Sequence, residues 1–147
     1  MMIPYLSLVL IEDKTEEDPE QKIFRLKKNF RLDFDEIGSY QIGRLSTCNP
    51  RLNVHRLSGV SRQQCIIRIV SVDEIRLYDG DGRSPSTYGT TVNGIRYYCS
   101  PDNAEECNGT RFFDKGSIGM GLLTFQARMQ GIKSDSFDPW RTGGMSI

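Results

Sequence analysis

Short apolar and β-branched segments recur about every 8 to 15 residues along the chain, and Gly, Pro, Asn or Asp lies between them. Because their apolar positions alternate with polar ones, we expect these segments to be strands. No window keeps an apolar stripe at helical spacing for more than about two turns, so the predicted class is all-β, a sandwich or a barrel. The expected strands are residues 5–11, 22–26, 29–34, 39–43, 65–70, 74–79, 90–98, 110–113 and 122–129.

Segments rich in turn residues separate the expected strands and delimit the domain. Residues 15–21 (TEEDPEQ) are expected to form an exposed hairpin loop, and residues 100–109 a longer loop. Residues 116–121 (GSIGMG) contain three glycines and are expected to form a tight turn. From about residue 131 the alternation ends, which predicts a β-sandwich domain over residues 1–130 and a flexible tail over 131–147.

Length and charge narrow the classes of function. A chain of 147 residues is the usual size of one domain. Nineteen basic and nineteen acidic residues cancel, and no segment collects like charges, so we expect neither a nucleic-acid nor a membrane partner. The apolar run at residues 3–11 is too short to cross a bilayer and follows no basic segment, so we expect an intracellular protein in the cytoplasm, with the nucleus left open.

The residues that usually carry catalysis or bind metals are scarce. The four cysteines lack Cys-x-x-Cys spacing and His55 is the only histidine, so we expect reduced thiols, no metal, no cofactor and no enzyme activity. Asp79 and Asp81 begin a segment that resembles a calcium loop. Arg83 at its fifth place, Ser84 at its sixth and Thr90 at its twelfth replace the residues that calcium requires, so a calcium site is rejected.

Hydroxyl and arginine side chains gather in three of the expected loops. They occur in Gly43-Arg44, in residues 60–65 (VSRQQC) and in residues 86–90 (STYGT). An arginine can hold a phosphate through two parallel hydrogen bonds, and Ser and Thr hydroxyls can complete the shell without any catalysis. Loops at one end of a sandwich could bring the three segments together.

The order of these segments resembles the forkhead-associated (FHA) domain. Gly43-Arg44 is followed by Val60-Ser61-Arg62, then by Asp79, and then by residues 86–94 (STYGTTVNG) and a final Phe-bearing strand. The resemblance extends over about residues 4–129. It implies a sandwich of two antiparallel sheets whose loops at one end bind phosphothreonine peptides.

Carried over by position, the resemblance assigns two groups of residues. Those expected to bind the phosphopeptide are Arg44, Ser61, Arg62, Thr87 and Tyr88. Those expected to support the binding loops are Gly43, Gln64, Gly89, Thr90 and Asn93. The chain departs from the family pattern at Gln64, where a His is usual, and at Tyr88, where an Asn is usual.

The expected function is a phosphothreonine-reading interaction module in Ser/Thr kinase signalling, with a Ser/Thr-phosphorylated protein as its partner. The alternative is a phosphate-independent assembly or scaffold domain, because a Tyr88 phenol cannot pair with a peptide backbone as an amide does. Thr15 is followed by three acidic residues, which suggests a further hypothesis. Phosphorylated Thr15 of one chain would dock in the site of another.

Overall fold

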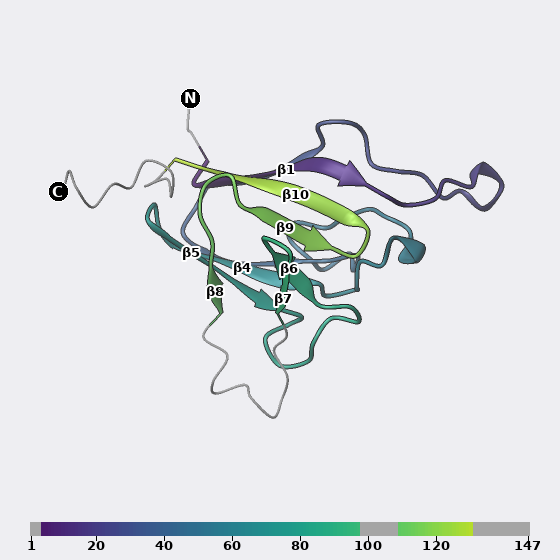
Figure 1. Cartoon of the computed structure of the whole chain (residues 1–147). Helices are drawn as coiled ribbons and strands as arrows, with labels where there is room; N and C mark the ends of the chain where they lie inside the picture. Colours follow the sequence, from purple (N-terminus) through teal and green to yellow (C-terminus); the bar gives the residue numbers. More distant parts are fainter. Residues whose placement is uncertain (1–3, 98–108, 131–147) are drawn as a thin grey trace.

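Strands pair in two antiparallel sheets in the computed structural model, which describes residues 4–97 and 109–130 (Figure 1). The six-stranded sheet has the order β2-β1-β10-β9-β6-β7, and the four-stranded sheet has the order β3-β4-β5-β8. The strands of the two sheets are β1 (Leu6–Asp13), β2 (Arg31–Phe34), β3 (Gly38–Ile42), β4 (Cys65–Ser71), β5 (Glu74–Asp79), β6 (Thr90–Val92), β7 (Ile95–Tyr97), β8 (Thr110–Arg111), β9 (Ser117–Met120) and β10 (Leu123–Met129). In the described ranges, two 3₁₀ helices, η1 (Pro19–Gln21) and η2 (Arg56–Ser58), lie in loops.

The first and last strands, β1 and β10, pair with each other inside the six-stranded sheet. The β1–β10 register runs from Leu6 opposite Met129 to Asp13 opposite Leu123, and it shifts between Leu10 and Glu12. The sandwich therefore needs residues from both ends of the segment that resembles an FHA domain. The expected all-β sandwich of two antiparallel sheets is confirmed.

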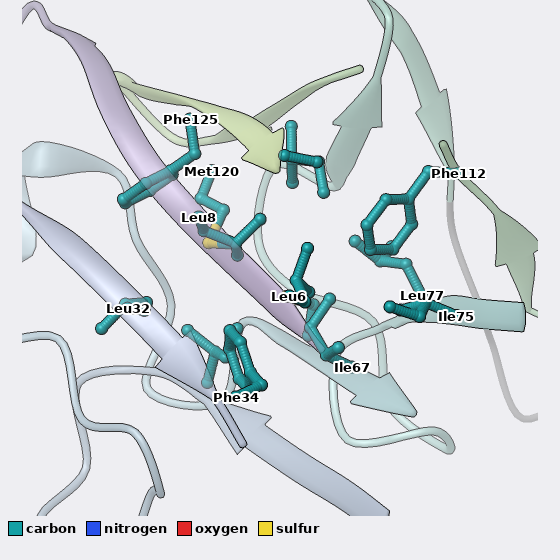
Figure 2. Packing of buried hydrophobic residues seen from close by; sticks show 14 of the residues in the cluster. Leu6, Leu8, Leu32, Phe34, Ile67, Ile75, Leu77, Phe112, Met120 and Phe125 are labelled. Atoms are coloured by element: carbon teal, nitrogen blue, oxygen red, sulfur yellow. The ribbon is translucent and has the colours of Figure 1, made fainter. Parts of the chain in front are cut away.

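The core lies between the two sheets because the apolar residues of facing strands alternate inward. Figure 2 shows Leu6 of β1 beside Ile67 of the four-stranded sheet and Leu8 beside Met120, with Phe34 in the same cluster. All of these side chains are fully buried. Burial of such a side chain stabilises the fold by about 1.5 to 3 kcal/mol, so this alternation provides much of the driving force for the sandwich.

The segment after β1 differs from the prediction, since residues 22–26 form no strand. Within this segment only Ile23 bridges another residue, Asp18. Lys22 caps the end of η1 with φ 58°, a left-handed conformation that lies outside the strand region. Side-chain bonds organise the loop instead: Arg25 Nε donates to the Thr15 carbonyl at 2.7 Å, and the Leu26 N–H to an Asp13 carboxylate oxygen at 3.0 Å.

The glycine-rich segment 116–121 also differs, because most of it is strand β9 and not a tight turn. Ile118 and Met120 point into the core, and β9 pairs with β10 on one side and β6 on the other. A Cβ atom on Gly119 would overlap the Thr91 hydroxyl on β6. Gly119 therefore allows close strand contact, and only Gly121, at φ 59°, makes the turn that was expected.

Two further expectations fall at the limits of the described residues. The tail 131–147 and nearly all of the loop 100–109 lie outside them, as do Cys99 and Cys107. Among the residues that are described, no helix has both the length and the apolar character needed to span a membrane.

Candidate functional site

Three loops meet at one end of the sandwich, and backbone bonds join the first two. The Arg44 N–H donates to the Ser61 carbonyl and the Leu45 N–H to the Arg62 carbonyl, both at 3.2 Å. A Cβ atom on Gly43 would overlap the Arg62 carbonyl oxygen. Glycine is therefore required at position 43 for the loop after β3 to lie against the loop before β4.

Ser61 connects the second loop to the third. Its hydroxyl oxygen accepts a hydrogen bond from the Thr87 N–H at 2.9 Å and lies 3.3 Å from the Thr87 hydroxyl oxygen. The structure thus places Ser61 and Thr87, 26 residues apart in the sequence, in direct contact at the surface. Their two hydroxyls form an adjacent pair of polar groups that could donate to one anionic oxygen.

Arg44 is half-buried and lies next to the Ser61 backbone. Its Nε donates to the Val60 carbonyl at 2.7 Å, and its own carbonyl accepts from Arg51 Nε at 3.0 Å. Within the described residues, its two Nη groups make no hydrogen bond. Arg44 is therefore held through Nε while the end of its guanidinium keeps its donors available for an anion.

Gln64 connects the second and third loops from a buried position, with 1% of its surface exposed. Its side-chain oxygen accepts from the Ser61 N–H at 2.8 Å. Its side-chain nitrogen donates to the Gly89 carbonyl at 3.1 Å and to the Thr90 hydroxyl oxygen at 2.9 Å. One amide both accepts and donates here, so Gln64 stabilises the contact between the Ser61 loop and the Thr87 loop.

Asp79, at the end of β5, is the supporting residue that the sequence analysis did not assign. It is buried, and its carboxylate accepts from the Ser86 N–H at 2.9 Å and from the hydroxyls of Ser86 and Thr90, each at 2.7 Å. Asp79 thereby closes the loop from residue 80 to residue 89 at its base. An Asp ending a strand, followed by Ser and Thr before the next strand, is the sequence signal that could have identified it.

Asp81 shapes the outer part of the same loop. One of its carboxylate oxygens accepts from the N–H groups of Ser84 at 2.6 Å and Arg83 at 2.8 Å. These two donors lower the pKa of the Asp81 carboxyl. The carboxylates of Asp79 and Asp81 are thus used inside the loop, and in the described part of the chain no cluster of residues could hold a metal ion.

Arg62 and Tyr88, both expected to contact a peptide, lie in two neighbouring hollows. Arg62 is exposed and lines a hollow of about 210 Å³ together with Ser61 and Thr87. Tyr88 is 59% exposed and lines a second hollow of about 380 Å³ with Leu57 and other residues. Because Tyr88 directly follows Thr87, the second hollow begins next to the residue that lines the first.

Gly89, Thr90 and Asn93 occupy the path from the third loop into β6 and the turn after it. Gly89 has φ 80°, a conformation that favours glycine, and Thr90 is fully buried between Gln64 and Asp79. Asn93 lies in the β6–β7 turn, where its side-chain oxygen accepts from the Ser117 N–H at 3.0 Å. That bond anchors the turn to the start of β9 rather than to residues 86–89.

The two described cysteines are buried and free. Cys48 Sγ lies 3.3 Å from the Arg62 carbonyl oxygen, and Cys65 begins β4. Burial raises the pKa of both thiols. Each thiol therefore stays protonated near neutral pH, a state typical of structural cysteines.

The fold and the end loops define a class of protein: β-sandwich modules whose loops gather polar residues at one end. Residues 40–104 match the family model of the FHA domain. This match and the solved FHA domains of the same fold confirm the resemblance to the FHA domain seen in the sequence. No curated protein matches the chain.

Solved FHA domains share this fold. One is an FHA domain described for phosphothreonine-dependent interactions, with a TM-score of 0.58 and 23% identity over 86% of this chain and 98% of that one. The FhaA FHA domain, in complex with the intracellular domain of Rv3910, has a TM-score of 0.56 and 23% identity over 84% and 99%. An FHA domain from Chlamydia trachomatis has a TM-score of 0.58 and 14% identity over 84% and 95%.

Proposed function

We propose that the three end loops bind phosphothreonine peptides and that the module recruits a Ser/Thr-phosphorylated protein by binding alone. The observation that carries this proposal is Arg44, whose backbone N–H and Nε bond the carbonyls of Ser61 and Val60 and whose Nη groups make no hydrogen bond within the described residues. A phosphate group carries close to two negative charges and three strong acceptors. Arg44 would supply the charge-assisted bonds, and the two hydroxyls would supply further donors.

Two solved FHA domains of the same fold support the proposed phosphopeptide binding by analogy. A solved neighbour is described for phosphothreonine-dependent interactions, and another was solved in complex with an intracellular domain. A partner phosphorylated by Ser/Thr kinases would place this module in kinase signalling inside the cell.

The hollow lined by Tyr88 supports a position for the peptide segment next to the phosphothreonine. Leu57 and Leu122 contribute apolar surface to it, and Arg56 contributes a cation. A peptide side chain there would meet apolar surface with a positive charge at its rim. Tyr88 would then act through apolar contact rather than through a backbone hydrogen bond.

Direct binding to peptides tests the proposal. We expect a library of phosphothreonine peptides to contain ligands for the full chain, and dephosphorylation of those peptides to weaken binding at least about tenfold, because charge-assisted bonds would be lost. Fluorescence anisotropy with matched phosphorylated and unphosphorylated peptides measures this. If no phosphopeptide binds, the proposal is wrong.

The exposed apolar surface of Tyr88 and Leu57 favours one alternative, a phosphate-independent interaction domain. In that case, the same peptides would bind equally well with and without phosphate. Replacement of Tyr88 by Ala would then weaken binding more than replacement of Arg44.

Substitution of Ser61 by alanine is expected to weaken phosphopeptide binding about tenfold. Ser61→Ala removes a hydroxyl that would donate to the phosphate, and it leaves the Thr87 N–H without its 2.9 Å acceptor. Isothermal titration calorimetry measures the loss. Ser39→Ala, on an exposed position of β3, is the matched control and should bind as the unaltered chain does.

Self-association through phosphorylated Thr15 meets an obstacle in the structure. Thr15 is only 2% exposed, and its hydroxyl is buried without a hydrogen-bond partner in the described part of the chain. A kinase could reach this hydroxyl only after the segment around it opened. The docking of one copy on another would therefore follow a change in the loop between β1 and β2.

A further inference from the structure

Ser84 lies on the outer part of the third loop, and its surroundings differ from those of the other hydroxyls there. The side chain is exposed and makes no hydrogen bond within the described residues, whereas those of Ser86 and Thr90 are buried and bonded to Asp79. Pro85 follows Ser84 directly. An exposed serine before a proline is the dipeptide that proline-directed Ser/Thr kinases modify.

Ser84 also shares a hollow with the proposed phosphate site. The hollow of about 210 Å³ is lined by Ser84 and Pro85 on one side and by Ser61, Arg62 and Thr87 on the other. The Ser84 N–H is held by Asp81 at 2.6 Å, and a Cβ atom on Gly80 would overlap the Ser84 carbonyl oxygen. The backbone that carries Ser84 is therefore closely packed at the edge of this hollow.

We propose that Ser84 is a phosphorylation site and that its phosphorylation closes the end-loop site to phosphopeptides. This inference rests on the proposed function. In the modification, the γ-phosphoryl group of ATP is transferred to Ser84 Oγ by a proline-directed kinase. A new O–P bond forms at Ser84, the bond from the γ-phosphorus to the bridging oxygen of ADP breaks, the hydroxyl proton is released, and ADP leaves.

A phosphate on Ser84 would compete with an incoming phosphate in two ways. The Arg62 guanidinium lines the same hollow and offers a bidentate partner to the attached phosphate, which would occupy the space beside Ser61 and Thr87. Asp81 also lines this hollow and carries a further negative charge. Two phosphates in neighbouring positions, each with close to two charges, repel each other, and we expect this repulsion to weaken binding about tenfold.

The test uses the full chain with Ser100→Ala, because residues 100–101 form a second Ser-Pro dipeptide. A proline-directed kinase and ATP are added, and mass spectrometry locates the phosphate. We expect modification at Ser84 and about tenfold weaker binding of a phosphothreonine peptide that the unmodified chain binds. The Ser84→Ala variant should take up no phosphate under these conditions and should keep its affinity after kinase treatment.

A second pair of variants separates local charge from a general effect of charge. Ser84→Glu is expected to weaken binding about threefold, since a carboxylate carries half the charge of a phosphate. Ser39→Glu places the same charge on exposed β3 and should leave binding unchanged. Failure of the kinase to modify Ser84, or equal affinity before and after modification, overturns the inference. If the unmodified chain binds no phosphopeptide, the proposed function itself fails.

Discussion

Replacement of Arg44 by alanine is expected to weaken phosphothreonine-peptide binding about a hundredfold, the largest loss for any single side chain of the site. A hydrogen bond to a charged group contributes about 1.5 to 3 kcal/mol, and the guanidinium can make two such bonds to one phosphate. A loss of about 3 kcal/mol corresponds to about a hundredfold in Kd. Isothermal titration calorimetry with one phosphopeptide across all variants measures it.

Two control variants separate recognition of the phosphate from maintenance of the loop. Arg44→Lys keeps the charge without the planar pair of donors, and we expect an intermediate loss. Arg68→Ala removes an exposed arginine from β4 and should leave the affinity unchanged. Because Arg44 Nε also bonds the Val60 carbonyl, a thermal melt must show that Arg44→Ala remains folded. A folded Arg44→Ala chain with unaltered affinity would contradict the assignment.

Replacement of Asp79 by alanine is expected to lower the free energy of unfolding by about 3 to 5 kcal/mol. Its carboxylate accepts from three donors, the Ser86 N–H and the hydroxyls of Ser86 and Thr90, and both residues are buried. Each buried donor left without a partner costs about 1 to 3 kcal/mol. Urea denaturation followed by circular dichroism measures the change.

Asp81→Ala is the matched control, because it removes the same side chain two residues further along. Its carboxylate accepts only backbone N–H groups in an exposed turn, so we expect a loss of about 1 kcal/mol. If Asp79→Ala cost no more than Asp81→Ala, the buried carboxylate would not be the base of the loop. Asp79→Ala should also weaken phosphopeptide binding, since Thr87 depends on the same loop.

Several strands could be predicted from the sequence because their alternation is a local property. Residues 74–79 were expected as a strand and form β5 with those bounds. The strand predicted at residues 22–26 and the tight turn predicted at 116–121 were wrong, because local alternation does not decide the conformation of these segments. Lys22 adopts its left-handed conformation after η1, and Gly119 is a strand residue because Thr91 of β6 lies against it. Both depend on neighbours that a local pattern does not reveal.

The sequence by itself determined the all-β class, several of the turns, and the order of Arg44, Ser61 and Thr87 along the chain, because alternation and turn chemistry act over a few residues. Only the tertiary structure decided how these residues meet. The bond from Thr87 to Ser61 and the bonds of Gln64 to the third loop join residues 25 to 26 positions apart. Such contacts form only when both sheets pack on one core and hold the loops at the same end. The same packing leaves Ser84 exposed beside the site and Thr15 buried away from solvent.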